Sequence, residues 1–549
     1  MKAVIAARTT PEGTKPMIDP ATTLRETVSA HGDALAVVCD ERRQTYAEMY
    51  DRACRLANAL RDAGIKPGDR VAVLADNDLE SIEIIAGLAL GGYVICPLYT
   101  HQTAEGNAYL LDLIEATALI IQERHHTALA PLLGTAPGLR LTVVIGEETA
   151  APRYSELLAA ASAEDPMVPL KPDATHVIRF SAGTTGRPKG IVHDVKGWMA
   201  MGDLWRAAWG RHWSPTDRYL APGPISHATG LLVWPVIEGG AGVVVMRGFD
   251  PGRFLELAER ERATVTLLVP TMVQMVLGHP DVGRRDVSSM HTIFYGAAPM
   301  PRPTLVKALS VWGPIMYQAY GQSEALPISI LRPEHHILEG TEEEIGRLRS
   351  AGRPCPGAEV RIADDEGGDV PTGEIGEIVV RTPGAMSGLW KDPAGTAARL
   401  TPDGYMRTRD MGYLSPNGFL YLTDRKDDMI ISGGFNIWPA ELESALLGHP
   451  AVREATVVGV PHEKWGETPH AIVVLGEGDG DTATETDLID FMRTAVGSTK
   501  KPTAVHFAGE LPKTPLGKVL RRAAREAHCA GCGGSPSTGG TTPSTDRSA

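Results

Sequence analysis

The sequence predicts an α/β protein in which a large layered α/β N-terminal domain with a β-rich subdomain precedes a small α+β C-terminal domain. The chain has 549 residues, and one hydrophobic core rarely serves more than about 250–300 residues, so two or more domains are expected. Short β-branched runs alternate with segments of helical periodicity, which is typical of a largely parallel sheet covered by helices. From about Ala358, short strands punctuated by Gly, Pro and Asp indicate a β-rich part.

Apolar, β-branched runs bounded by polar or Gly-containing segments predict the strands of the layered domain. These runs are Arg70–Ala75, Tyr93–Leu98, Leu141–Gly146, Thr175–Phe180, Val243–Met246, Thr264–Val269 and Thr292–Tyr295. Between them, Leu255–Arg262 has apolar residues at helical spacing. The uncharged stretch from Ile84 to Tyr99 is interrupted at Gly91-Gly92 and is short for a membrane span of about 20 residues. We interpret it as a buried helix, a turn and a buried strand.

A second change of texture follows the charged cluster 424–428, and we place the domain boundary there. The β-rich part before it has strands at Ala358–Ala363, Glu377–Arg381 and Phe419–Leu422. The unit after it is predicted to contain strands at Met429–Ile431, Thr456–Val460 and Ala471–Leu475, and helices from Pro439 and over Leu488–Val496. We therefore expect domains over 1–426 and 427–527 and a disordered Gly/Ser/Thr/Pro-rich tail over 528–549. Cys529 and Cys532 in this tail lack a second pair and predict no metal site.

Composition narrows the function. Lys and Arg number 53 and Asp and Glu 67, a formal charge of −14, which argues against non-specific nucleic-acid binding and against docking on anionic lipid. Six scattered cysteines and an N-terminus without a long apolar region favour the cytoplasm. An anionic small-molecule substrate would need a local positive site. A homodimer is an option that the sequence leaves open.

The most informative segment is the loop Ser181-Ala182-Gly183-Thr184-Thr185-Gly186, followed by Lys189. Glycines let the backbone turn tightly and present N–H groups to an anion, hydroxyls add donors and Lys189 adds charge. The string is neither a Walker A loop nor a dinucleotide-binding G-x-G-x-x-G. It predicts a phosphate-binding loop, whereas a Gly/Thr loop taken by itself would be equally typical of a flexible surface loop.

At this loop the sequence resembles the adenylate-forming superfamily of acyl- and aryl-CoA synthetases, luciferases and peptide-synthetase adenylation domains. Further segments match that family's motifs in the family's order. They are Pro224–Gly230 with His227, Tyr295-Gly296-Ala297-Ala298, Tyr320-Gly321-Gln322-Ser323-Glu324, Thr408-Arg409-Asp410, Asp424–Ile430 with Arg425 and Asp427, Ser432-Gly433-Gly434-Phe435-Asn436, and Leu511–Lys518. The resemblance implies a carboxylate–CoA ligase that uses ATP, Mg²⁺ and CoA and acts through an acyl-adenylate.

The resemblance also implies a role for each matched residue. The loop with Lys189 would hold phosphates, Glu324 Mg²⁺, Ser323 the α-phosphate, Asp410 the ribose hydroxyls and Arg425 the ribose or phosphate. Gly296, Ala297, Ala298, Tyr320, Gly321 and Gln322 would complete the ATP site, and His227 would lie between the acyl pocket and the nucleotide. Lys518, on a mobile C-terminal domain, would bridge the attacking carboxylate and the α-phosphate, while Asp427 would be the hinge. Gly433, Gly434, Asn436 and Trp465 would bind CoA. Taken alone, Asp410 is more often a turn residue, Glu324 a solvated charge and His227 a core histidine.

Departures from the family pattern keep alternatives open. Ser226 replaces an aromatic residue, Arg409 a glycine and Asp424 a glycine, and Thr499 stands where an aromatic residue can line the CoA channel. An amine or a carrier-protein thiol therefore remains an alternative acceptor, and a non-catalytic nucleotide-binding relative is a more distant one.

The sequence gives the least information about the residues that line the acyl pocket. No Lys or Arg adjoins His227, which argues against a dicarboxylate. Trp198, Trp205, Trp209 and Trp213 recur at near-helical spacing, which favours core packing over pocket lining. We expect a medium-chain, alicyclic or aromatic acid as substrate.

Overall fold

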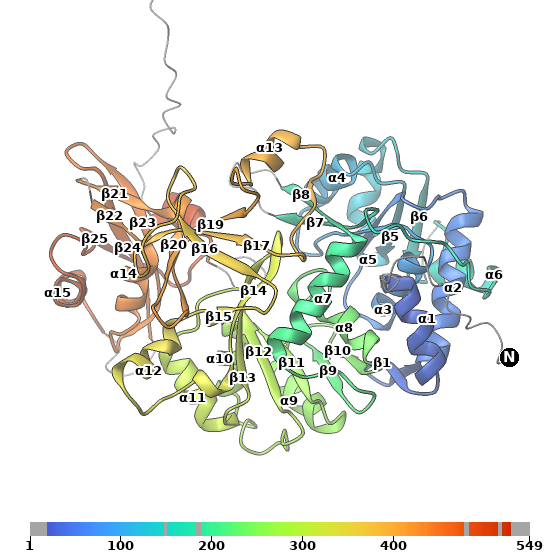
Figure 1. The fold of residues 1–549 in the computed structure, drawn as a ribbon, viewed down its shortest axis with the longest axis horizontal. Helices are drawn as coiled ribbons and strands as arrows, with labels where there is room; N and C mark the ends of the chain where they lie inside the picture. Colours follow the sequence, from blue (N-terminus) through green and yellow to red (C-terminus); the bar gives the residue numbers. More distant parts are fainter. Residues whose placement is uncertain are drawn as a thin grey trace, which may run out of the picture. The chain divides into compact units, whose positions relative to one another are not determined.

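The structure, a computed structural model, describes residues 19–147, 151–181, 188–433, 435–476, 482–513 and 519–528, without the side chains of Ser181, Asp427 and Asn436. It separates into two compact units, Met1–Leu422 and Thr423–Ala549. Each unit has its own sheets and hydrophobic core (Figure 1).

The first unit contains a nine-stranded sheet and a seven-stranded sheet, both mostly parallel. The first runs in the order β15 (Arg353–Pro354), β14 (Ala325–Leu331), β13 (Met316–Gln322), β12 (Thr292–Gly296), β11 (Val265–Leu268), β9 (Arg218–Ala221), β10 (Gly242–Val245), β1 (Leu35–Cys39) and β2 (Arg42–Thr45). The second runs β18 (Gly388–Leu389), β8 (Lys189–Asp194), β7 (Thr175–Ser181), β4 (Val94–Pro97), β3 (Arg70–Leu74), β5 (Ala118–Gln122) and β6 (Leu141–Ile145).

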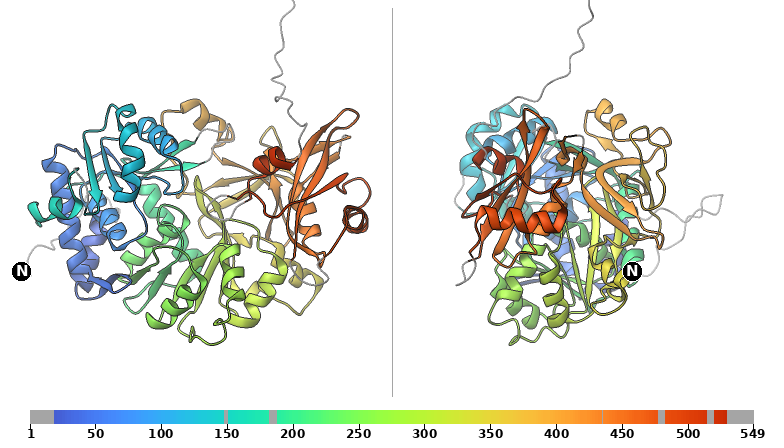
Figure 2. Two further views of the ribbon diagram at one scale, coloured as in Figure 1. Left: turned by 180° about the vertical axis from the view of Figure 1, so that it is seen from behind. Right: turned by 90° about the vertical axis from the view of Figure 1, so that its left-hand side faces the viewer.

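Helices cover both faces of these sheets, as the alternating pattern predicts (Figure 2). One face of the nine-stranded sheet packs against α1 (Pro20–His31), α2 (Tyr46–Asp62), α3 (Leu79–Leu90), α7 (Val195–Trp209) and α8 (Val233–Glu238). Helices α2 and α3 also contribute to a core of the seven-stranded sheet. The nine-stranded sheet is covered on its other side by α9 (Pro251–Arg260), α10 (Pro270–Gly278) and α11 (Arg302–Trp312). The seven-stranded sheet carries α4 (Ala104–Leu113), α5 (Glu123–Leu129) and α6 (Tyr154–Ala160).

A smaller antiparallel sheet forms the predicted β-rich part. Its strands are β16 (Glu359–Ala363), β17 (Gly376–Arg381), β19 (Met406–Leu414) and β20 (Leu420–Arg425). Two short helices, α12 (Glu342–Gly346) and α13 (Pro393–Ala398), lie in the connecting segments. The carboxyl end of β20 crosses from the first unit into the second.

The second unit is an α+β fold with five strands and three helices among its described residues. The strands are β21 (Ile430–Ser432), β22 (Phe435–Ile437), β23 (Val452–His462), β24 (Gly466–Leu475) and β25 (Ala504–Phe507). The helices are α14 (Pro439–Leu446), α15 (Glu485–Val496) and α16 (Arg521–His528). Of the predicted tail, His528 ends α16 and 529–549 lies outside the described residues.

Local sequence explains where the elements begin. The Ile84–Tyr99 stretch forms the end of α3, a Gly91-Gly92 turn and β4, as predicted. Helix α7 starts at Asp194, whose carboxylate accepts the Gly197 N–H at 2.8 Å, and it ends at Gly210 in the left-handed region. Trp205, Trp209 and Trp213 are buried in the core, so the packing interpretation of the tryptophan spacing is confirmed for them.

Candidate active site

The predicted phosphate loop joins two paired strands. β7 and β8 are antiparallel, with Ser181 opposite Lys189, and 182–187 between them lies outside the described residues. The Lys189 ammonium lies 3.0 Å from the Asp392 carboxylate at the start of α13. A hydrogen bond from the Gly395 backbone N–H and the contact with Lys189 both lower the pKa of Asp392. The ammonium of Lys189, at the end of the loop, is therefore paired with a carboxylate from a segment far along the chain.

Two matched motifs lie at the carboxyl ends of neighbouring parallel strands, where ligands of open α/β sheets bind. β12 ends at Gly296, where a Cβ would lie 2.2 Å from the Ala319 carbonyl oxygen, so only glycine fits beside β13. The next residue, Ala297, has φ +65°, in the left-handed region. Ser323 and Glu324 form the turn from β13 to β14.

The structure brings the Tyr320 motif and Asp410 together in one buried cluster. The Tyr320 hydroxyl donates to Asp410 Oδ2 at 2.7 Å, and the Gln322 amide donates to the same oxygen at 2.5 Å. The Gln322 amide also reaches the Thr408 carbonyl at 2.8 Å. Asp410 is 6% exposed. One carboxylate oxygen is thus fixed by two donors, which orients the group before any ligand binds.

Arg409 explains why the family pattern has glycine before this aspartate. Its φ is +62°, in the left-handed region that favours glycine. The Arg409 N–H donates to Glu377 Oε1 at 3.1 Å, and the other oxygen of Glu377 accepts from Arg407 at 2.9 Å. The strained residue is therefore held by a buried carboxylate on the adjacent strand.

Glu324 has a carboxylate that fits Mg²⁺ in the presence of phosphates. It is buried, and its Oε1 lies 3.5 Å from the Arg399 guanidinium, a long contact for an ion pair. No group of three His, Cys, Asp or Glu side chains gathers at metal spacing within the described ranges. Mg²⁺ is usually held by one or two carboxylates together with substrate phosphates, so a lone buried glutamate is a fitting donor set.

His227 is neutral and fixed in orientation. Burial, together with the positive charge of Arg179, lowers its pKa to about 4. Ser226 Oγ lies 2.8 Å from Nδ1, and the ring of Tyr99 lies 4.4 Å from the imidazole. The residue that departs from the family pattern, Ser226, thus orients the histidine, and Tyr99 supplies an aromatic neighbour.

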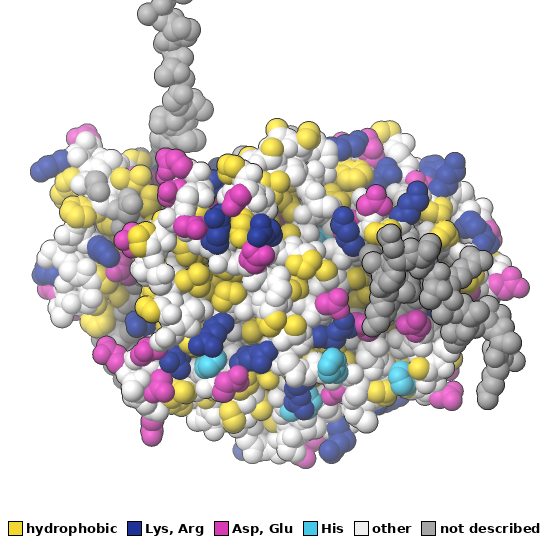
Figure 3. All heavy atoms as spheres, in the orientation of Figure 1, with side chains coloured by type: hydrophobic (Ala, Val, Ile, Leu, Met, Phe, Trp, Pro, Cys, Tyr) yellow, Lys and Arg dark blue, Asp and Glu magenta, His cyan; other side chains and the backbone are white. Residues whose placement is uncertain are grey.

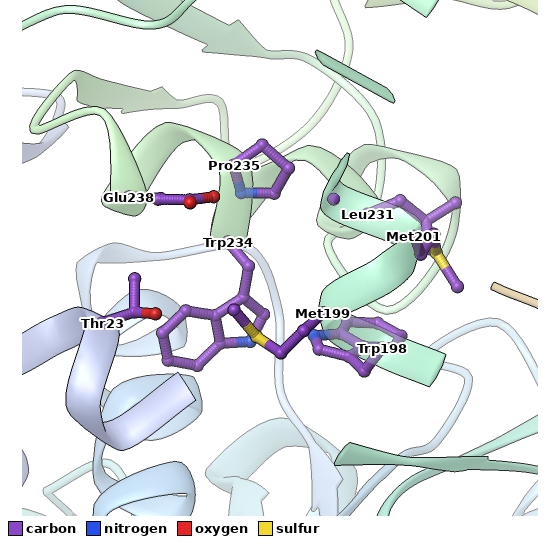
Figure 4. Close-up of a pocket in the computed structure, with 9 residues that line it drawn as sticks. Thr23, Trp198, Met199, Met201, Leu231, Trp234, Pro235 and Glu238 are labelled. Atoms are coloured by element: carbon purple, nitrogen blue, oxygen red, sulfur yellow. The ribbon is translucent and has the colours of Figure 1, made fainter. Parts of the chain in front are cut away.

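Residues close to His227 in the sequence, among them Leu231 and Trp234, line a small cavity together with Trp198 (Figure 4). Met199, Met201 and Pro235 add to its apolar lining, and Thr23 and Glu238 are polar lining residues. Neither His227 nor Ser226 lines this cavity.

In the second unit, Gly433 and Trp465 come together. Gly433 has φ +58°, and its N–H donates to the Trp465 carbonyl at 2.9 Å. Trp465 is 41% exposed, and its indole stacks on the His462 imidazole with 4.5 Å between the ring centroids. Asn436 lies in β22, and Gly434 is outside the described residues. An exposed aromatic face beside a glycine turn is thus available to a ligand.

The predicted hinge segment is tied to α16. The Arg521 guanidinium lies 3.0 Å from Asp424 and 2.6 Å from Asp428, and it contacts Glu443 at 2.7 Å. Arg425 is the last residue of β20, and Asp427 lies in the short turn 426–428 between the two clamped aspartates. Lys518 lies outside the described residues.

Sequence reasoning missed three residues of this site. Asp392 and Arg399 lie far along the chain from Lys189 and Glu324, and no local pattern links them. Arg179 had a signal, because a charged residue within a buried strand is unusual. No Lys or Arg lies next to His227 in the sequence, but Arg179 lies close enough in the structure for its charge to act on the imidazole. A cation therefore does lie near His227, and its predicted absence gives no reason to exclude a dicarboxylate.

Comparison with known families decides the assignment. Residues 24–390 match the model of the AMP-binding enzyme family, and 441–518 match the model of the AMP-binding enzyme C-terminal domain. The chain belongs to the AMP-binding enzyme family. The predicted family and enzyme class, an AMP-forming ligase, are thereby confirmed.

Relatives of this AMP-binding enzyme pass the acyl group to different acceptors, according to their names. A feruloyl-CoA synthase from an Amycolatopsis species is 36% identical over 484 residues, 87% of this chain and 92% of that protein. A fatty acid–[acyl-carrier-protein] ligase, ScoC, from Streptomyces coeruleorubidus is 34% identical over 514 residues, 92% of this chain and 96% of that protein. The structure of the amide bond synthetase McbA from Marinactinospora thermotolerans is 31% identical, with TM-score 0.83 over 92% of this chain and 99% of that one. This agreement confirms the predicted fold class.

Within the described ranges, no helix of this AMP-binding enzyme combines the length and apolarity that a membrane span requires. On the face drawn in Figure 3, basic and acidic side chains are interspersed.

Proposed function

We propose that this AMP-binding enzyme joins a medium-chain, alicyclic or aromatic carboxylic acid to CoA through an acyl-adenylate, releasing AMP and pyrophosphate. The observation that carries the proposal is the buried cluster of Tyr320, Gln322 and Asp410 at the strand ends, in a chain of this family. A prepositioned carboxylate suits the two hydroxyls of a ribose, because its oxygens are acceptors only. The feruloyl-CoA synthase among the relatives supports an aromatic acid and CoA.

Adenylation brings two anions together, so it needs fixed donors and positive charge more than an acid–base pair. In this proposal the loop 181–186 and Lys189 bind phosphates, Ser323 bonds the α-phosphate and Arg425 contacts the ribose or phosphate. Gly296, Ala297, Ala298 and Gly321 leave room for the nucleotide at the strand ends. Glu324 holds Mg²⁺, which neutralises charge on the phosphates when bound. Neutral His227 separates the acyl group from the nucleotide without adding charge.

The second half-reaction requires the predicted C-terminal domain, 427–527, to turn. Asp427 would absorb the backbone change and withdraw Lys518, which serves the first half by bridging the carboxylate and the α-phosphate. The turn would bring Gly433, Gly434, Asn436 and Trp465 to the thiol substrate. The exposed stacked indole of Trp465 supports a role in binding the CoA adenine or pantetheine.

An amine or carrier-protein acceptor is the second candidate, favoured by one observation. Thr499 replaces an aromatic residue of the CoA channel, and the ammonium of the next residue, Lys500, lies 2.9 Å from both carboxylate oxygens of Glu441. A lysine engaged in this way has less positive charge to offer to the CoA phosphates. We keep CoA as the first choice and propose a cytoplasmic enzyme without a nucleic-acid partner, with a homodimer left open.

The test separates the two half-reactions. Lys518→Ala should abolish acid-dependent pyrophosphate release yet leave thioester formation from a supplied acyl-adenylate largely intact. Lys513→Ala is the matched control, because Lys513 belongs to the same segment as Lys518 but pairs with Glu454. Equal loss of both half-reactions in Lys518→Ala would contradict the role given to Lys518. Pyrophosphate release that needs no acid would contradict the proposed function.

A further inference from the structure

Arg179 places a guanidinium inside β7, in a run that is otherwise apolar from Val177 to Phe180. Its side chain is half-buried, and burial lowers the pKa of the guanidinium. Among the described residues it makes no hydrogen bond and no ion pair. A charge withdrawn from water is costly unless it is paired. An arginine kept here without a protein partner therefore points to a bound anion.

The register of β7 and β8 shows on which face of this strand pair Arg179 lies. Arg179 faces Ile191 across the hairpin, and Val177 faces His193, so Arg179 and His193 share a face of the β7–β8 pair. The His193 Nε2 lies 2.8 Å from the Ser323 carbonyl oxygen. That face is thus next to the turn that carries Glu324.

Tyr99 shows what lies on the opposite side of Arg179 from the Ser323–Glu324 turn. The Tyr99 hydroxyl donates to the Phe180 carbonyl, and its ring lies 4.4 Å from the His227 imidazole. Arg179 therefore lies between the Ser323–Glu324 turn and the Tyr99–His227 pair. Its charge interacts with four titratable neighbours, Tyr99, His193, His227 and Glu324.

The charges here do not cancel. The Glu324 carboxylate lies 3.5 Å from the Arg399 guanidinium, whereas Arg179 makes no ion pair within the described residues. His227 is neutral, because burial lowers its pKa to about 4. Among the described side chains here, two guanidiniums therefore interact with one carboxylate, which leaves one positive charge in excess.

We propose that Arg179 binds the reacting carboxylate of the acid substrate and holds it beside His227 for attack on the α-phosphate. This inference rests on the proposed function. A guanidinium presents a planar fork that matches a carboxylate with two parallel hydrogen bonds. The excess charge offsets the repulsion between the carboxylate and the phosphates as they approach.

The experiment compares the full-length enzyme with Arg179→Met and Arg179→Lys. Wild type is first screened for pyrophosphate release with ATP, Mg²⁺ and ferulate, benzoate, cyclohexanecarboxylate or octanoate, and the best acid is kept. Arg179→Met should raise the KM for that acid about 10- to 100-fold, the effect of losing a charged hydrogen bond. The KM for ATP should stay unchanged, and Arg179→Lys should recover part of the loss.

A neutral probe separates charge recognition from pocket shape. The Ki of the primary alcohol with the same carbon skeleton should not change in Arg179→Met, because the alcohol has no carboxylate. Arg218→Met is the matched control: Arg218 is also half-buried, but its guanidinium bonds the carbonyls of Pro215 and Asp217 at 2.8 Å. It should leave both values unchanged.

Three results would overturn the inference alone: a rise in the KM for ATP instead of the acid, a Ki of the alcohol that rises in step with the KM of the acid, or no change in either KM. If no acid supports pyrophosphate release by wild type, the proposed function fails and the inference falls with it.

Discussion

The ammonium of Lys189 lies 3.0 Å from the carboxylate of Asp392. In the proposed function, phosphates bound at the loop would compete with this carboxylate for the lysine. Both side chains are more than a third exposed, so water screens the pair and the competition is weak. Asp392→Asn should therefore lower the KM for ATP by up to about fivefold. Steady-state kinetics with varied ATP measures it.

The control for this change is Asp392→Ala. The Asp392 carboxylate also accepts the Gly395 N–H at 2.7 Å at the start of α13, so Ala removes the helix cap as well. It should lower thermal stability, which Asn should largely keep. A higher KM for ATP in Asp392→Asn would contradict the competition.

The Asp410 carboxylate is expected to bind ATP through its charge. Asp410→Asn should raise the KM for ATP about 10- to 100-fold, since a charged acceptor is lost. Tyr320→Phe removes one donor to the same oxygen and keeps the charge, so its effect should be about fivefold or less. If Tyr320→Phe proved as damaging as Asp410→Asn, the tyrosine would have a direct role of its own.

Backbone strain at Arg409 predicts that substitution by glycine and by valine will change the free energy of unfolding by different amounts. Its φ of +62° costs glycine nothing but strains a β-branched residue. Arg409→Gly should change the free energy of unfolding by less than about 1 kcal/mol, and Arg409→Val should lower it by about 1–3 kcal/mol. Urea denaturation of both variants measures this difference, and equal effects would argue against the strained conformation.

Buried histidines predict acid sensitivity. Burial lowers the pKa of His176 to about 3 and that of His193 to about 4. Below the unfolded value of about 6.5 the unfolded chain binds protons that the folded chain does not, so stability falls as the pH decreases from about 6.5 toward 4. Each histidine should contribute about 1–2 kcal/mol of loss between pH 7 and 5.

Urea unfolding followed by tryptophan fluorescence at the two pH values checks this. His176→Phe, which can pack against Trp198 and Trp234, should flatten the pH dependence. A slope identical to wild type would show that His176 does not titrate in this range.

The predicted hinge can be tested by stiffening it. Asp427→Pro should slow thioester formation more than adenylation, because proline fixes φ and removes the backbone N–H at the position expected to turn. Single-turnover measurements of acyl-AMP and acyl-CoA formation separate the two steps. Asp428→Asn is the control, since it weakens the contact with Arg521 without constraining the backbone. Full wild-type turnover in Asp427→Pro would remove residue 427 from the hinge.

The local sequence pattern was enough to predict most helices and strands and the residues that belong to each motif. The β-branched runs became β3, β4, β6, β7, β10, β11 and β12, because nearly continuous apolar runs are typical of strands buried on both faces of a sheet. The pairing of Tyr320 with Asp410 could be expected only from the order of motifs, since these residues meet through two different sheets. The contacts of Lys189 with Asp392 and of Glu324 with Arg399 depend on long-range packing, which no spacing along the chain encodes.

The central claim is adenylation of a carboxylic acid followed by transfer to CoA. The most direct measurement is mass spectrometry after incubating the enzyme with ATP, Mg²⁺, CoA and a pooled library of aliphatic, alicyclic and aromatic acids. The account predicts an acyl-CoA mass for at least one acid, with formation of AMP, and no such mass in Lys518→Ala. Acyl-AMP without any acyl-CoA would contradict CoA as the acceptor and direct attention to an amine or a carrier protein.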